Sequence, residues 1–205
     1  MTAHPLLPHL LAAARGSFPP VDGVVEVLPA CGRNDVVVAF TGHSFVCTDA
    51  PDADGRVGDG FGGSLAPDVL RWLAGPTGWI DSIDALLVAD GLGGGTLAPT
   101  TAFDDHHRVA FARRVRDDVD VYGDERGMFT IATALAGHRE CSVEVDPANR
   151  SRGNGRSLLL DARRQTPEGE LLFAAVAPGN AASLRAFLAA GFRPIGSQVL
   201  IQPVR

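Results

Sequence analysis

Lysine is absent from this chain of 205 residues, and all eighteen basic residues are arginines. A phosphate-binding loop of the Walker type uses a lysine that reaches the phosphates, and Schiff-base catalysis uses a lysine amine. The sequence therefore excludes both kinds of site.

Cysteines are few, and long apolar runs are missing. Cys31, Cys47 and Cys141 lie far apart and show no C-x-x-C or Cys/His ligand spacing, so we expect neither a disulfide framework nor a metal site. No window approaches the ~18 uninterrupted apolar residues of a membrane span. The segment 2–15 has no basic leader, and Pro8 breaks its apolar run, which indicates a short amphipathic helix. These absences predict a cytoplasmic protein that does not contact a membrane.

The net charge is −6, which argues against nucleic acid as a partner. Its distribution is uneven, because ten Asp and two Arg lie between residues 49 and 105, whereas eleven arginines lie between residues 108 and 164. This asymmetry favours an anionic cofactor beside a cationic or neutral substrate; two ordinary solvated faces are the alternative. The oligomeric state stays open, with a homodimer among the options.

Residues 90–101, DGLGGGTLAPTT, form the clearest linker. Before it we expect an N-terminal α+β region, residues 1–100, of unknown role; after it, a second domain, residues 101–205. The strands expected in the first region are 24–28, 36–40 and 45–48, arranged as a meander, and 83–89, with a helix at 67–74. The second region is expected to hold strands at 119–122, 128–134, 141–145, 171–176 and 198–201, and helices at 107–116, after 155 and at 180–190. This order predicts an α/β (α+β) fold with a mixed, mostly antiparallel central sheet and helices on both faces.

A glycine-containing turn follows the strand that ends at Val145. In Arg150-x-x-Gly153-x-Gly155 the glycines permit close approach, so that consecutive amides can point into one concavity at the start of a helix. Arg152 and Arg156 add charge beside Arg150. The pattern predicts a pyrophosphate cradle; a solvated surface turn is the alternative.

The helix at 180–190 has clear boundaries. Asn180 is a good N-cap with Ser183 at the third helical position, and Gly191 suits a left-handed C-cap, after which Phe192 can pack on Phe187. A purely structural account of this helix is therefore available.

The two segments together resemble the GNAT superfamily of acyl-CoA-dependent N-acyltransferases. The signature [QR]-x-x-G-x-[GA] matches Arg150-x-x-Gly153-x-Gly155, preceded by V-x-P, and the downstream N-x-x-[SA]…G-F pattern matches the helix that starts at Asn180; the similarity covers roughly residues 108–201. It implies acetyl-CoA as co-substrate and no metal. The residues implied for the cofactor are Val143, Val145, Arg150, Arg152, Gly153, Asn154, Gly155, Arg156, Asn180 and Ser183.

The resemblance implies attack of a primary amine, on a small molecule or a peptide, on the acetyl thioester. Glu140 and Glu144 are the candidate bases. Many family members protonate the leaving thiolate with a tyrosine four residues before the helix-ending glycine, and here that position is Phe187. Tyr122, the single tyrosine, is the candidate replacement acid.

Two alternatives stay open. The first is an acyl-CoA-binding module, sensory or structural, whose chemistry has decayed. The second is a hydrolase that uses Ser44, although position 46 is Val where a G-x-S-x-G elbow needs Gly. His138 is expected in a solvent-exposed turn.

Overall fold

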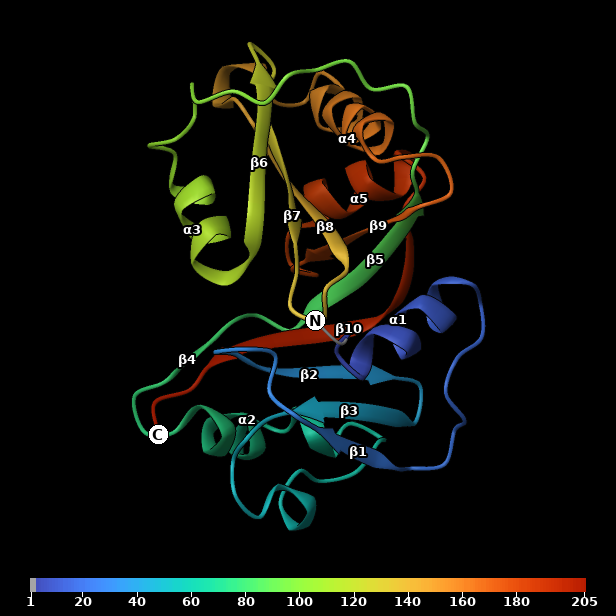
Figure 1. Ribbon diagram of the computed structural model, residues 1–205, viewed down its shortest axis with the longest axis vertical. Coiled ribbons are helices and arrows are strands. Elements are labelled where there is room, and N and C mark those ends of the chain that lie inside the picture. The colour runs from blue at the N-terminus through green and yellow to red at the C-terminus, as the bar shows by residue number, and fades with distance from the viewer. Residues whose placement is uncertain (1–2) are drawn as a thin grey trace. The chain divides into compact units, whose positions relative to one another are not determined.

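The computed structural model describes residues 3–205 and forms two compact units. The first unit holds the chain through Leu86 together with Ile195–Arg205, and the second is Leu87–Pro194. This division differs from the expected one at residue 100, because residues 197–202 pair with strands of the first unit. The fold is mixed α/β, with mostly antiparallel strand pairing and five α-helices among the described residues, as predicted (Figure 1).

The strands of the first unit are arranged around a hairpin of β2 and β3. The C-terminal part of β10 lies antiparallel to β2, with Val199 opposite Val37. β1 pairs in parallel with β3, so the predicted meander is wrong. Alternation of apolar residues identifies a strand without specifying its neighbour. The elements are α1 (Leu6–Ala14), β1 (Val25–Leu28), β2 (Asp35–Phe40), β3 (His43–Cys47), the 3-10 turns Ala53–Gly55 and Gly63–Leu65, α2 (Pro67–Ala74), β4 (Trp79–Ile80) and β10 (Arg193–Gln202).

The two helices of this unit cover opposite faces of the hairpin. Phe45 faces α1, where the His9 ring lies 4.3 Å away between centroids. Its neighbour Val46 packs in a buried cluster with Leu73 of α2. Because successive side chains of a strand point to opposite faces, α1 and α2 enclose the strands from both sides.

The second unit contains the strand order β5-β9-β8-β7-β6. β6, β7 and β8 form an antiparallel meander, as predicted. The glycine-rich linker after Asp90 has no regular structure, also as predicted. The elements are β5 (Asp84–Asp90), α3 (His107–Val115), β6 (Asp117–Asp124), β7 (Gly127–Thr133), β8 (Arg139–Val145), the 3-10 turn Pro147–Asn149, α4 (Asn154–Gln165), β9 (Leu171–Val176) and α5 (Ala181–Ala189).

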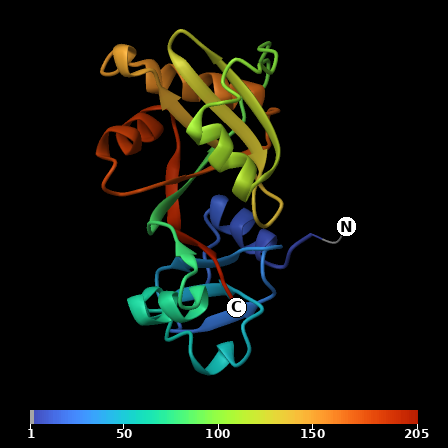
Figure 2. The ribbon, with the colours of Figure 1, turned by 90° about the vertical axis from the view of Figure 1, so that its left-hand side faces the viewer.

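Helices lie on both faces of the meander. The side chain of Glu144 meets Arg108 of α3, whereas the adjacent Val145 lies against the first turn of α4 at Gly155. Figures 1 and 2 both show α3 beside β6 and β7. Between residues 3 and 205, no helix combines the length and apolar character needed to cross a bilayer.

Candidate functional site

One backbone edge of β8 is open along most of its length. On one side, all seven residues of β8 pair with β7. On the other side, the parallel pairing with β9 in the described chain consists of Glu140 opposite Phe173. Past Glu140, no described residue of β8 has a registered partner in β9.

The alternation of hydrogen bonds shows which residues face the open edge. The amide of Asp146 donates to the carbonyl of Arg126 at 3.0 Å, just beyond the last registered pair of the two strands. Opposed residues of an antiparallel pair alternate between bonded and non-bonded, so the even-numbered residues of β8 bond to β7. Val143 and Val145 therefore turn their N–H and C=O groups toward the open edge.

The chain next enters α4 through residues in the left-handed backbone region. Ser151 has φ of 60° and Gly153, the N-cap residue, has φ of 82°. The Gly153 N-cap makes no side-chain capping bond to the first amides of α4. A Cβ at Gly153 would meet nothing within 4 Å, so the space before the helix is open. Free amides and the partial positive charge at such a terminus suit a phosphate group.

Gly155 brings the helix terminus and the open edge of β8 together. A Cβ at this position would lie 3.4 Å from Cβ of Ala186 on α5 and 3.5 Å from Cγ2 of Val145. Both distances are ordinary van der Waals contacts, so the first turn of α4 packs closely against α5 and against the end of β8.

The three arginines of the turn have different environments. Arg150 donates to Glu144 at 3.1 Å and is 59% exposed. Arg152 and Arg156 are exposed and have no hydrogen-bond or ion-pair partner within residues 3–205. Two guanidinium groups are therefore free to bind an anion at the start of α4.

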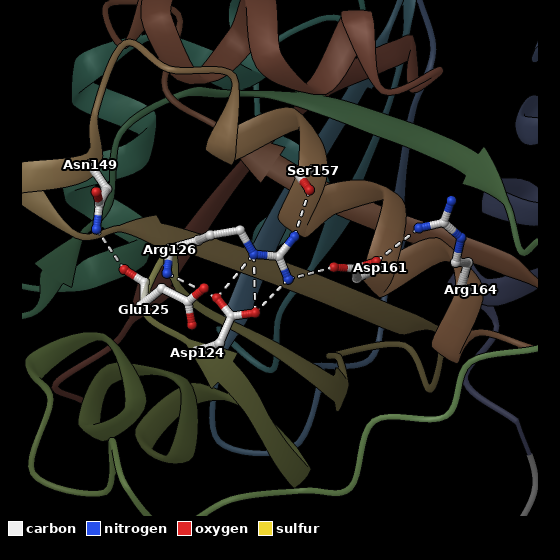
Figure 3. A network of polar contacts seen from close by, with 7 residues as sticks. All are labelled: Asp124, Glu125, Arg126, Asn149, Ser157, Asp161 and Arg164. Atoms are coloured by element: carbon white, nitrogen blue, oxygen red, sulfur yellow. Dashed lines mark hydrogen bonds and ion pairs between the residues drawn. The ribbon is translucent and has the colours of Figure 1, made fainter.

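A polar network holds this turn against the hairpin between β6 and β7 (Figure 3). Arg126, in the hairpin turn, donates to Asp124 at 2.6 Å, to Oγ of Ser157 at 2.5 Å and to Asp161 at 2.8 Å. The bond to Asp124 is the largest of the contacts that raise the pKa of Arg126, so its charge is permanent. One cation thus links the hairpin to the second and third turns of α4.

Two asparagine side chains of the turn donate hydrogen bonds to backbone carbonyls of the protein. Nδ2 of Asn154 donates to the carbonyl of Asn149 at 2.9 Å, and Nδ2 of Asn149 donates to the carbonyl of Glu125 at 2.6 Å. Asn154 therefore offers a ligand its backbone amide, while its side chain shapes the turn.

The boundaries of α5 confirm the sequence-based prediction. Oδ1 of Asn180 accepts the amide of Ser183 at 3.1 Å. At the other end, Gly191 has φ of 89°, and the amide of Phe192 donates to the carbonyl of Phe187 at 3.1 Å, as in a Schellman ending. The rings of Phe187 and Phe192 meet edge to face, 4.9 Å apart. Asn180 and Ser183 remain at the partly exposed start of the helix.

Glu140, a candidate base, is buried in an ion pair. Its side chain is 2% exposed and meets the Arg116 guanidinium, while Oε2 lies 3.5 Å from Nε2 of His138. Burial alone would raise the pKa of Glu140, but the Arg116 guanidinium and the nearby His138 ring outweigh it and hold the pKa at about 2. Such a carboxylate is a weak proton acceptor at neutral pH. Its position indicates a structural role.

Glu144 and Tyr122, the other catalytic candidates, lie on opposite faces of the meander. Glu144 accepts from Arg108 at 2.9 Å and from Arg150 at 3.1 Å and is 21% exposed. Tyr122 stacks on Phe129, which is registered opposite Val143. It is thus two strands from β8, about 10 Å. Burial raises the pKa of Tyr122. The structure does not bring these two side chains together.

His138 is buried, so the expectation of an exposed turn is wrong. The amide of Ala134 donates to the carbonyl of His138 at 2.8 Å, which extends the hairpin by one pair. The ring lies 4.7 Å from that of Phe173, and the residue is 5% exposed. Neither ring nitrogen has a hydrogen-bond partner in the described part of the chain. Sequence reasoning missed this group, as well as Arg116 and Arg126. The partner of Arg116 lies 24 residues away, and Asp161 lies 35 residues from Arg126.

The hydrolase alternative is contradicted by the geometry of β3. Ser44 is fully buried, and its hydroxyl accepts from Ser64 at 2.9 Å. His43 is the preceding residue of the same strand, so its side chain points to the opposite face, where it contacts Asp22 at 2.9 Å. A serine nucleophile activated by this histidine is therefore excluded.

No protein-family model matches the chain, and no curated protein does. Among the solved structures that are similar to part of it are two acetyltransferases. One is an acetyltransferase of the GNAT family from Colwellia psychrerythraea, with a TM-score of 0.40 and 11% identity over 62% of this chain and 57% of that chain. The other is a GCN5-related N-acetyltransferase from Kribbella flavida, with a TM-score of 0.38 and 16% identity over 67% of this chain and 63% of that one. The chain thus spans less than two thirds of either structure.

Proposed function

We propose that this protein is an N-acetyltransferase that transfers an acetyl group from acetyl-CoA to a primary amine of a small molecule or peptide. The observation that carries the proposal is the junction at Gly155, where the open edge of β8 meets the uncapped N-terminus of α4. A strand edge can pair with the amide groups of a pantetheine arm, and a helix terminus can bind the pyrophosphate that follows it.

Each element of the site has a distinct part in binding. The amides from Arg152 to Arg156 face the pyrophosphate, with the free guanidinium groups of Arg152 and Arg156 at its sides. Val143 and Val145 pair with the pantetheine arm through their backbone groups. Asn180 and Ser183 border the cofactor at the start of α5, since α5 touches α4 next to Gly155.

The proposed chemistry is direct transfer. The amine nitrogen attacks the thioester carbonyl, and a backbone N–H at the open edge of β8 stabilises the oxyanion. The C–S bond then breaks, and the thiolate leaves without an acid, because a thiol pKa of ~8.5 makes it a tolerable leaving group. Before the attack the substrate ammonium loses one proton to water, with Glu144 as the candidate carboxylate acting through that water, and the nitrogen loses a second proton to solvent as the amide forms. Glu140 takes no part in proton transfer in this proposal, because its carboxylate is buried in an ion pair with Arg116.

An acyl-CoA-binding module without turnover is the second candidate function. Phe187 is buried at the position where the resembled family carries tyrosine, and Glu140 is held by Arg116. Both observations remove an expected acid or base and leave the binding surface intact. Release of CoA thiol in the presence of a panel of amines separates the two functions.

Calorimetry with acetyl-CoA tests the binding site directly. We expect micromolar affinity, and a loss of at least about tenfold for S-acetylpantetheine, which has no pyrophosphate. Gly153→Val should weaken acetyl-CoA binding by about tenfold or more, because a branched side chain projects into the open space before α4.

Gly169→Val is the matched control. Gly169 shares with Gly153 a φ of 82° and an open Cβ position but lies in the loop before β9. The backbone strain is therefore the same, and affinity should stay within about twofold of the wild type. Equal affinity of folded Gly153→Val and wild-type protein, or no binding of acetyl-CoA by the wild type, would refute the cradle.

A further inference from the structure

A group of metal-ligating side chains lies in the first unit, apart from the site described above. His4, Cys31 and Cys47 come from three segments: the chain before α1, the turn after β1 and the end of β3. Their donor atoms all lie within 4.8 Å of one another. Both cysteines are buried and are free thiols, and His4 is partly exposed.

The spacing of these atoms is close to that of a tetrahedral zinc site. With Zn–S of about 2.3 Å and Zn–N of about 2.05 Å, tetrahedral angles place sulfur and nitrogen about 3.6 Å apart and two sulfurs about 3.8 Å apart. Sγ of Cys31 lies 3.6 Å from Nε2 of His4 and 3.9 Å from Nδ1. The Cys31–His4 separation thus already matches a shared ion, and the other donor separations, which reach at most 4.8 Å, need to shorten by no more than about 1 Å.

The surroundings of His4 orient its ring for this role. Nε2 contacts the carbonyl of Pro29 at 2.9 Å, and Nδ1 accepts the amide of Leu6 at 3.2 Å. Metal-bound histidines commonly donate their other ring N–H to a backbone carbonyl, which fixes the tautomer. With Nε2–H donated to Pro29, Nδ1 is the ligating nitrogen, and it exchanges the amide of Leu6 for the ion.

The net charge of a zinc-loaded site is compatible with the burial of the two cysteines. Binding replaces two S–H bonds by two Zn–S bonds and releases two protons to solvent. Zn²⁺ with two thiolates and a neutral imidazole carries no net charge, so the loaded site avoids the cost of an uncompensated buried ion. The partly exposed side of His4 leaves a fourth position for water.

We propose that His4, Cys31 and Cys47 form a zinc site that fastens the start of α1 to the strands of the first unit. The proposal is independent of acetyl transfer, because every ligand belongs to the first unit. The ion would connect the helix to two segments that lie 27 and more residues away.

Metal analysis of the purified protein tests the proposal. After incubation with ZnSO₄ and removal of free metal, we expect about one zinc per chain, and none in His4→Ala or Cys31→Ser. Zinc should also protect Cys31 and Cys47 from alkylation, as read by peptide mass spectrometry, and chelation should lower the melting temperature. Cys141→Ser is the matched control, since Cys141 is a buried thiol of the second unit and should leave zinc content unchanged.

Three results would overturn the zinc site. They are a folded wild-type protein without zinc, equal zinc content in folded wild type and His4→Ala, and a Cys31–Cys47 disulfide in the freshly purified protein. Because His4→Ala keeps both buried thiols, its fold, checked by circular dichroism, separates loss of a ligand from loss of structure.

Discussion

At the scale of single residues, the buried pair of Glu140 and Arg116 makes the clearest prediction. Glu140→Gln leaves the Arg116 cation, which is 12% exposed, without its counter-ion. Breaking a buried pair from one side costs roughly 3–5 kcal/mol of unfolding free energy. Denaturant unfolding at pH 7 should show a loss of this size.

Glu170→Gln is the comparison for this loss. Glu170 pairs with Arg139 at 2.9 Å, but its side chain is 50% exposed. Removing a solvated pair should change stability by less than about 1 kcal/mol. If both variants lose equal stability, burial does not determine how much the ion pair of Glu140 contributes to the free energy of unfolding.

The same pair predicts how stability depends on pH. The pKa of Glu140 falls from 4.5 to about 2 on folding, because Arg116 and His138 outweigh the effect of burial. A lowered pKa gives stability that is complete above about pH 4.5 and is lost as the pH falls toward 2. The difference between wild type and Glu140→Gln should therefore shrink between pH 5 and pH 3. A difference independent of pH over this range would show that folding does not lower the pKa of Glu140.

Residues with local partners were predictable from the sequence, and residues with distant partners were not. Asn180 and Gly191 were assigned correctly because capping depends on positions three or four residues away. Glu140 depends on Arg116, 24 residues away, and no spacing rule encodes that distance. The proximity of His4 and Cys47 was not predicted for the same reason, because ligand-spacing rules cover only ligands that lie close together in the chain.

At the scale of elements, the contact between the β6–β7 hairpin and α4 controls the position of the proposed phosphate site. Arg126→Gln removes the cation that joins Asp124, Ser157 and Asp161. Because hydrogen bonds to charged groups contribute about 1.5–3 kcal/mol, we expect a loss of about 2 kcal/mol of stability. Acetyl-CoA should bind several-fold more weakly, as measured by calorimetry, although Arg126 is not assigned to the cofactor.

Arg164→Gln tests whether the hairpin contact matters more than the charge of α4. Arg164 pairs with the other carboxylate oxygen of Asp161 at 2.9 Å and is 53% exposed. It has no part in the link to the hairpin, so stability and affinity should stay near the wild type. Equal effects of the two variants would assign the result to the net charge of the helix.

The positions of helices and strands along the chain could be predicted from periodicity, whereas the pairing of strands with one another could not. The strand Leu171–Val176 and the helix Pro67–Ala74 have the predicted bounds. The parallel pairing of β1 with β3 and the short pairing of β8 with β9 depend on contacts across the chain that a local pattern cannot specify.

At the scale of the whole molecule, the first unit is discontinuous in sequence. Its central strand β2 pairs with β3 on one side and with the C-terminal part of β10 on the other. Val199 and Ile201 of β10 are fully buried in the same cluster as Val37. The sequence-based boundary at residue 100 places β10 in the second region. The order of elements along the chain does not show that the last strand pairs with a strand of the first region.

A fragment comparison tests this organisation. Residues 1–86 alone leave one edge of β2 unpaired and part of the apolar core open, so this fragment should aggregate or remain unfolded. Residues 1–86 joined to 193–205 by a flexible Gly/Ser linker of about 15 residues should unfold cooperatively. Trp72 and Trp79, the two tryptophans, both belong to this unit, so their fluorescence reports its folding without interference. Cooperative unfolding of residues 1–86 without β10 would contradict the division, because the returning strand would then be dispensable for the core that it completes.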